Sequence, residues 1–148
     1  MWLDYWKLTT FLIAAFAAYV AYRQHRLGKE KFKLDLFEKR YRVFAATRLL
    51  LTHVLQNGNV TLPELFEYRA GIGEASFLFS SDLVEYLEEI YRHALKLHTD
   101  HESVAPLPRG DERSRLAEEI CTGTGWLTDQ LPELKKRFAP YMAFNKWH

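Results

Sequence analysis

The residues best suited to chemistry lie in a histidine-rich stretch that runs from His93 to Glu102. His98 and His101 are three residues apart, so a helix would place both imidazoles on one face, as in a metal site. Asp100 and Glu102 lie beside them, but no third ligand is fixed by the spacing. We therefore predict a solvated polar helix end, with no bound metal and no other cofactor.

A second candidate pair is Arg48 and His53, which four residues separate. This spacing resembles the signature of HEPN ribonucleases, helical bundles that dimerise to cleave RNA. The resemblance implies that Arg48 and His53 would be the catalytic residues of a membrane-anchored ribonuclease. Arg92 and His98 have a similar spacing, and such pairs are expected by chance in a chain with this many arginines and histidines. The alternative is that Arg48 is a partly buried charge on a helix face and pairs with a carboxylate.

A third constellation lies in the sequence LPELFEYRAGIGEASFLF. Arg69 and Glu74 lie among apolar residues, so we predict that they form a buried ion pair across a face that Gly71 and Gly73 make tight. Glu67 and Glu74 could share a helix face, but the Glu-x-x-His helices of a di-iron bundle are missing. The chain also lacks a phosphate-binding loop, a Ser-His-Asp arrangement and a CxxC motif. A non-enzymatic protein is therefore favoured.

The chain opens with a long apolar stretch, and the 15 residues from Leu8 to Tyr22 carry no charge. Trp2, Leu3, Tyr5 and Trp6 precede it, and the 21 residues from Trp2 to Tyr22 would make about 31 Å of helix. That length matches a hydrocarbon core of about 30 Å. We predict a transmembrane anchor over residues 1–26 with interfacial aromatic and basic flanks; the alternative is an amphipathic core helix.

Basic residues follow the apolar stretch. Residues 23–42 contain eight basic and three acidic residues, a net charge of +5, whereas residues 43–148 carry a net charge of −4. Because Lys and Arg keep a flank in the cytoplasm, we predict a single-pass protein with its N-terminus outside and its C-terminal domain cytoplasmic. The residues predicted to contact anionic lipid headgroups are Arg23, Arg26, Lys29, Lys31 and Lys33. The acidic remainder argues against a nucleic-acid partner.

Small residues follow one face of the predicted anchor. Small side chains on one stripe let transmembrane helices approach closely, which predicts a homo-oligomer. The stripe consists of Thr10, Ala14, Ala17, Ala18 and Ala21. The alternative is that alanine is simply common in membrane helices.

Residues 27–148 are predicted to form an all-α cytoplasmic four-helix bundle. A first helix should continue from the anchor past Gly28 and end at Asn57-Gly58-Asn59, a strong turn signal. Its apolar face is predicted from a 3,4 spacing of Leu34, Phe37, Tyr41, Phe44, Arg48, Leu51 and Leu55.

Three further helices are predicted from caps and turns. A capping box at Thr61 and Glu64 should begin a helix that runs to about residue 79. A new N-cap at residues 80–82 should begin another, whose face is Leu83, Leu87, Ile90, Ala94 and Leu97. After a loop over 103–110, a last helix should span 111–138 with a kink or break near Pro132. The single cysteine, Cys121, suits a reducing compartment.

Two segments, KFKLDLFEKRYRVFAATR (31–48) and ELFEYRAGIGEASFLF (64–79), resemble an uncharacterised family of small bacterial proteins with an N-terminal anchor. The resemblance covers roughly residues 31–98 and implies an inner-membrane protein. The predicted architecture is also similar to that of HEPN-like membrane accessory proteins of RNA-targeting CRISPR systems, which form oligomeric pores. We therefore predict a self-assembling scaffold or pore-type effector in phage defence or stress response. The alternatives are an anchored HEPN-like ribonuclease and an accessory subunit of a larger membrane complex.

Overall fold

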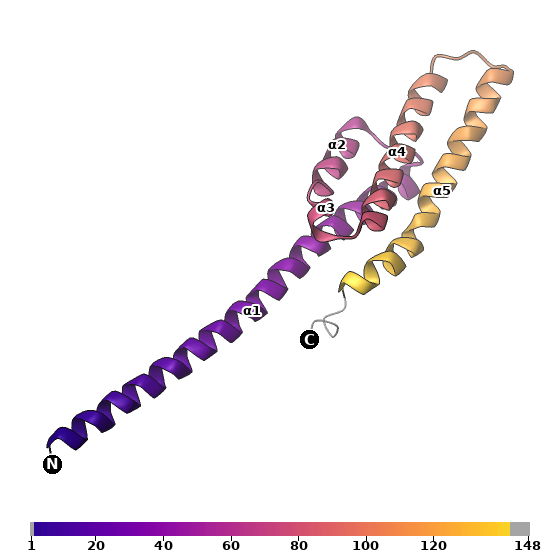
Figure 1. Cartoon of the computed structure of the whole chain (residues 1–148). Helices are drawn as coiled ribbons and strands as arrows, with labels where there is room; N and C mark the ends of the chain where they lie inside the picture. The colour runs from indigo at the N-terminus through magenta and orange to yellow at the C-terminus, as the bar shows by residue number, and fades with distance from the viewer. Residues whose placement is uncertain (1, 143–148) are drawn as a thin grey trace. The chain divides into compact units, whose positions relative to one another are not determined.

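The computed structural model describes the backbone of residues 2–142 and, within that range, the side chains of residues 6, 7 and 9–142. The described chain is all-α, as predicted, and has no strand. Its helices are α1 (Trp2–Asn57), α2 (Leu62–Gly71), α3 (Ala75–Leu78), α4 (Ser81–Val104) and α5 (Asp111–Met142) (Figure 1). Predictions about Trp2, Leu3 and Tyr5 concern side chains outside those described.

Helix α1 is one continuous helix of 56 residues. It passes Gly28 without interruption and ends at Asn57, as the turn signal predicted. Gly58 follows with a φ of +67°, a left-handed conformation that glycine adopts without strain. The chain divides within α1 into two compact units, Met1–Leu36 and Phe37–His148.

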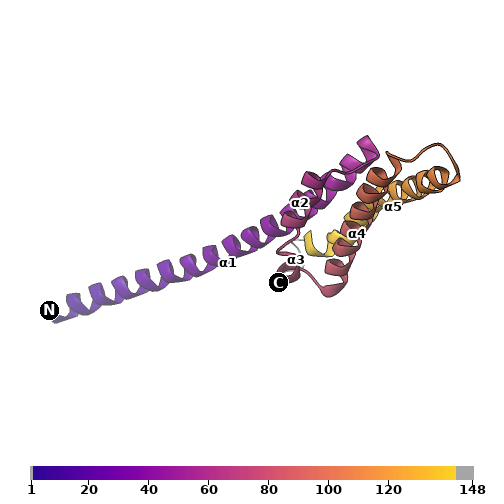
Figure 2. The ribbon, with the colours of Figure 1, turned by 90° about the horizontal axis from the view of Figure 1, so that it is seen from above.

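The second unit contains the hydrophobic core. Helices α4 and α5 lie side by side and antiparallel, joined by a loop at residues 105–110 (Figures 1 and 2). Helix α2 packs on α4, where Tyr68 and Tyr91 stack with ring centroids 6.5 Å apart. The predicted face of α4 is confirmed, because Leu83, Leu87, Ile90, Ala94 and Leu97 are all buried.

The face that α1 turns toward this core differs from the predicted one. Leu51 is buried as expected, but Tyr41, Arg48 and Leu55 are exposed. The residues that α1 buries are Val43, Thr47, Leu50, Leu51 and Val54. Thr47 is accommodated there because its hydroxyl donates to the Val43 carbonyl oxygen, at 2.9 Å. Because Thr47 is polar, a search for apolar residues at helical spacing selects the adjacent face of α1 and not the buried one.

Helix α2 begins as predicted and ends early. The capping box is present: the Thr61 backbone N–H donates to Glu64 Oε2 at 2.7 Å. The helix stops at Gly71 instead of continuing to about residue 79, and the single-turn helix α3 follows after a break. A Cβ added at Gly71 would lie 2.6 Å from the Ala46 Cβ of α1, so the predicted tight approach at Gly71 is confirmed.

Helix α5 runs without a break through Pro132 and Pro140. Of the predicted kink or break near residues 129–132, the break is therefore wrong, and the kink stays a prediction. Proline removes one backbone hydrogen bond and crowds the preceding turn. Here Leu127 and Leu134, on either side of Pro132, are both fully buried, and this packing holds the helix together.

Within the described residues, no helix has a stretch that is both long and apolar enough to cross a membrane. This finding does not support the transmembrane anchor predicted over residues 1–26. The uncharged run is only 15 residues long and includes the polar atoms of Thr9, Thr10, Tyr19 and Tyr22, which lower its apolar character.

Candidate functional site

The most prominent candidate is the apolar surface of α1 over residues 6–22. Seven large side chains are between 57 and 72% exposed, although residues of this size are usually buried. They are Trp6, Phe11, Leu12, Ile13, Phe16, Tyr19 and Tyr22. Successive helix residues are about 100° apart, so Phe11, Leu12 and Ile13 point in three different directions. A helix that is apolar all round needs a partner that surrounds it.

Side-chain size divides this surface into two sides. The predicted small-residue stripe of Thr10, Ala14, Ala17, Ala18 and Ala21 lies on one side of α1, because these positions recur at helical spacing. By the same spacing Leu12 and Phe16 lie on the opposite side. All seven side chains are exposed. The helix therefore offers a smooth face for close helix approach and a bulky face for a fluid apolar environment.

The polar atoms of this stretch are satisfied within the helix. The hydroxyls of Thr9 and Thr10 both donate to the Trp6 carbonyl oxygen, at 2.9 and 2.8 Å. A hydroxyl that is bonded inside its own helix loses little when water is removed. Transfer of Thr9 and Thr10 into an apolar phase therefore costs less than their residue type alone indicates.

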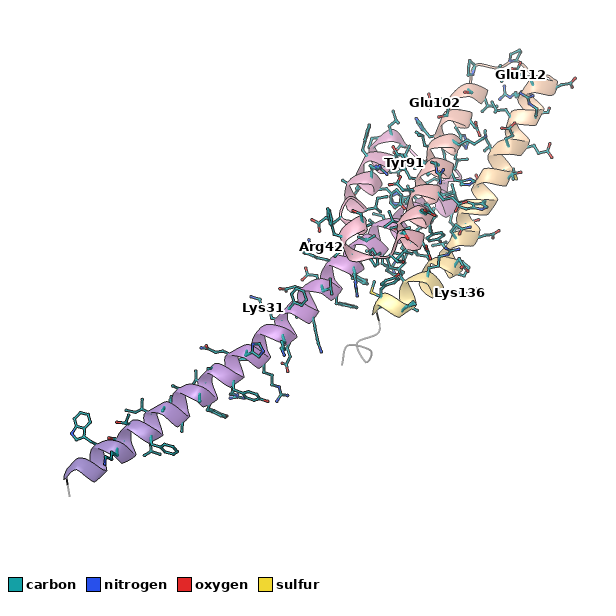
Figure 3. The ribbon with its side chains drawn as sticks, in the orientation of Figure 1. Lys31, Arg42, Tyr91, Glu102, Glu112 and Lys136 are labelled. Atoms are coloured by element: carbon teal, nitrogen blue, oxygen red, sulfur yellow. The ribbon has the colours of Figure 1, made fainter. Side chains whose placement is uncertain are left out.

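The basic segment follows directly. Arg23, Arg26, Lys29, Lys31 and Lys33 are all exposed, and Lys31 projects away from the ribbon in Figure 3. Arg23 lies 6.0 Å from the centre of the Tyr19 ring, and Arg26 forms an ion pair with Glu30 at 3.3 Å. Arginine beside tyrosine at the edge of an apolar stretch is typical of a membrane–water interface.

The chain does not bring Arg48 and His53 together in one protomer. Five helical positions separate them by about 140° around α1. Arg48 is exposed, and its guanidinium lies 5.9 Å from the centre of the Phe44 ring. The alternative expectation, a partly buried Arg48 that pairs with a carboxylate, is therefore wrong: the side chain contacts an aromatic ring instead.

His53 instead pairs with a carboxylate that the sequence did not indicate. Its Nδ1 lies 2.9 Å from Glu64 Oε1, and both side chains are about two-thirds or more buried. With Leu49, Glu67 and neighbouring residues they line a cavity of about 40 Å³. Burial opposes the charge of Glu64, but hydrogen bonds from Thr61 and the nearby His53 outweigh it and lower the pKa of Glu64. The pair joins α1 to the start of α2.

The predicted buried ion pair between Arg69 and Glu74 is wrong. Arg69 forms an ion pair with Glu88 of α4, and both side chains are about half exposed. The Arg69 guanidinium also lies 5.1 Å from the centre of the Tyr91 ring. The bond to Glu88 raises the pKa of Arg69. Glu74 is exposed and lies 3.9 Å from Lys39 of α1. The break after Gly71 ends α2, so the helical spacing that related the two residues does not apply.

Two histidines near the end of α4, His98 and His101, contact the turn between α1 and α2. His98 Nδ1 donates to the Val60 carbonyl oxygen at 2.9 Å, and His101 Nε2 donates to the Gly58 carbonyl oxygen at 3.0 Å. Both rings are half-buried, so the expectation of a solvated polar helix end is wrong for them. The described residues contain no group of three side chains that could hold a metal ion.

A larger cavity of about 430 Å³ lies between α4 and α5. The His93 and Trp126 rings stack on its wall with centroids 3.8 Å apart. Lys96 Nζ contacts Asp100 at 2.6 Å and Glu119 at 2.9 Å. Hydrogen bonds to these carboxylates raise the pKa of Lys96, and the bond from Lys96 lowers the pKa of Glu119. Lys96 therefore joins two carboxylates on the wall of this cavity.

No protein family, no curated protein and no solved structure matches this chain.

Proposed function

We propose that this protein is a self-assembling membrane protein whose N-terminal helical stretch is buried in lipid and against neighbouring copies. It acts as a scaffold or pore-type effector, with residues 27–148 presented in the cytoplasm. The observation that supports this proposal best is the exposed surface of residues 9–22, which carry no charge and present large apolar side chains in several directions.

Lipid fits this surface better than a single protein groove. A groove covers one side of a helix, whereas Phe11, Leu12 and Ile13 point in three directions. Hydrocarbon surrounds a helix and accepts bulky side chains without specific packing. The satisfied hydroxyls of Thr9 and Thr10 and the adjoining basic segment also favour this environment.

Self-assembly follows from the small-residue stripe. Because lipid tails are as apolar as leucine, membrane helices associate through close packing of small residues. Pairing of the alanine faces would leave Leu12 and Phe16 toward lipid. Several copies packed in this way can enclose a pore or form a platform, and conductance across a planar bilayer distinguishes the two.

Flotation with anionic vesicles tests the membrane part of this proposal. The full chain is expected to float with vesicles that contain phosphatidylserine, and a variant with Leu12→Lys and Phe16→Lys is expected to remain at the bottom of the gradient. The matched control is Phe66→Lys, since Phe66 is 68% exposed on α2, outside the N-terminal stretch. Equal flotation of both variants, or no flotation of the wild type, would contradict the proposal.

A further inference from the structure

The cavity between α4 and α5 has no part in the proposed membrane function, yet it has the size of a small-molecule site. Its volume is about 430 Å³, and such sites usually measure about 300–1,000 Å³. Its lining residues recur at intervals of three or four along each helix, so one face of α4 and one face of α5 form the walls. They include His93, Lys96 and Asp100 on α4, and Glu119, Thr122 and Trp126 on α5.

Two aromatic rings from different helices form part of this wall. The planes of the His93 and Trp126 rings differ by 17° and their centroids are 3.8 Å apart, so the rings stack. Both side chains are half-buried. Stacking holds each ring in one orientation, and the face of a tryptophan ring attracts cations more strongly than that of any other side chain. The wall therefore suits a planar ligand ring, above all one that belongs to a cation.

Gly123 leaves room beside Trp126. It lines the cavity three residues before Trp126 on α5. Packing does not require a glycine here, because an added Cβ would make only an ordinary contact, 3.9 Å from Leu97 Cδ1. Glycine nevertheless weakens a helix by about 1 kcal/mol relative to alanine. Gly123 thus costs helix stability and opens the wall of the cavity, as a site for a flat ring requires.

The charged groups of the cavity favour a ligand cation over an anion. The wall carries three carboxylates but, apart from His93, only two basic side chains. Lys96 is bonded to Asp100 and Glu119, and Arg115 lies 4.0 Å from Glu119. The Glu118 carboxylate, also on the wall, has no bonded partner among the residues that the structure describes. One carboxylate is therefore available to a ligand ammonium group.

We infer that this cavity binds an aromatic amine, a planar ring that carries a protonated amine. The ring lies over Gly123 and against Trp126, and the ammonium group reaches the Glu118 carboxylate. Five residues separate Glu118 from Gly123, which is about 7.5 Å along α5. A two-carbon chain between ring and nitrogen, together with the flexible Glu118 side chain, covers this separation. The site lies in the bundle unit, so the inference does not rest on the proposed membrane assembly.

Fluorine NMR tests the site with tryptamine that is fluorinated on its indole ring. The probe is added to the full chain in micelles of an uncharged detergent, and its signal is expected to broaden beyond its width in protein-free micelles. The matched control ligand is indole acetate with the same fluorinated ring. It is expected to bind about tenfold more weakly, because the carboxylates repel its negative charge instead of attracting an ammonium group.

Four variants locate the site. Gly123→Leu fills the space beside Trp126 and is expected to abolish binding. Trp126→Ala removes the stacking surface and is expected to weaken binding about tenfold. Glu118→Gln is expected to weaken it about two- to fivefold, the scale of an exposed ion pair. Glu112→Gln is the matched control, since it makes the same change on α5 outside the cavity, and it is expected to keep the wild-type affinity.

Far-UV circular dichroism of each variant separates loss of the site from loss of the fold. The charge change at Glu118 lies on an exposed side chain, so this variant is expected to keep the wild-type spectrum and carries the test if Gly123→Leu unfolds. Absence of broadening with the wild type, equal binding of the amine and the acid, or equal affinities of Glu118→Gln and Glu112→Gln would overturn the inference.

Discussion

At the scale of single residues, the bundle depends on a few polar atoms whose partners are specific. The carboxylate of Glu64 closes the capping box of α2 and pairs with His53 of α1, so one side chain joins two helices. Tyr68 and Tyr86 are both buried, but only the Tyr68 hydroxyl has a hydrogen-bond partner among the described residues. These contrasts give two predictions.

Glu64→Gln is expected to lower the free energy of unfolding at pH 7 by up to about 1 kcal/mol, because glutamine can still close the capping box but loses the negative charge beside His53 and the N-terminus of α2. The pKa of Glu64 is lowered in the folded state, so its contribution is complete above the ordinary value of 4.5 and is lost as the pH falls below it. Urea unfolding at pH 7 and pH 3.5 measures both effects, and the difference between wild type and variant should shrink at the lower pH. Glu67→Gln is the control, and an equal loss there would contradict the assigned role.

Tyr86→Phe is expected to leave stability unchanged or to raise it by up to about 1 kcal/mol, because it removes a buried hydroxyl that lacks a partner. Burial raises the pKa of Tyr86 to about 12, and the ring keeps its contact with Arg137, 4.3 Å away, in the variant. Tyr68→Phe removes a 3.0 Å bond to the Leu87 carbonyl oxygen and is expected to cost about 1 kcal/mol. Thermal unfolding distinguishes the two, and the same loss in both would show that the hydroxyls are equivalent.

At the scale of elements, α1 and α2 approach each other closely at Ala46 and Gly71. Gly71→Ala would normally help a helix by up to about 1 kcal/mol. Here the new Cβ would lie 2.6 Å from Ala46 Cβ, so we expect a net loss of about 1–3 kcal/mol. Adding Ala46→Gly should recover part of that loss, which a double-mutant cycle of chemical unfolding measures.

Gly125→Ala in α5 is the matched control. No side chain or distant backbone lies within 4 Å of the added Cβ there, so the same substitution is expected to stabilise by about 0.5–1 kcal/mol. If both glycine variants changed stability in the same direction, the close contact at Gly71 would not be the cause.

Most elements of the bundle could be predicted from local signals, and the errors have physical causes. The turn at Gly58, the capping box at Thr61 and the apolar face of α4 were all correct, since each depends on residues close in sequence. A kink or break was predicted near Pro132, and the break is wrong, because burial on both sides of the proline depends on helices distant in sequence. The core face of α1 was misassigned because one of its members is the polar Thr47.

The candidate sites were harder to predict than the elements. The pairing of Glu64 with His53, of Arg69 with Glu88 and of His98 with the Val60 carbonyl joins different elements, and nothing in their spacing indicates it. By contrast, the alanine stripe lies within one helix, where spacing alone fixes the face. This is why the N-terminal stretch carries the functional proposal.

At the scale of the whole molecule, the account depends on what covers the apolar N-terminal stretch. The alanine stripe predicts that copies associate there. Loss of this interface should therefore reduce the mass of the assembly without unfolding the bundle.

The most direct measurement is the mass of the full-length protein in lipid nanodiscs, compared with three single variants: Ala14→Leu, Ala18→Leu and the control Ala15→Leu. Ala15 lies about 100° from Ala14 around the helix, off the stripe, so the same change there should be accepted by lipid. We predict a discrete oligomer for the wild type and Ala15→Leu, and a smaller species for Ala14→Leu and Ala18→Leu. A wild-type monomer, or the same mass in all four proteins, would contradict self-assembly through this helix.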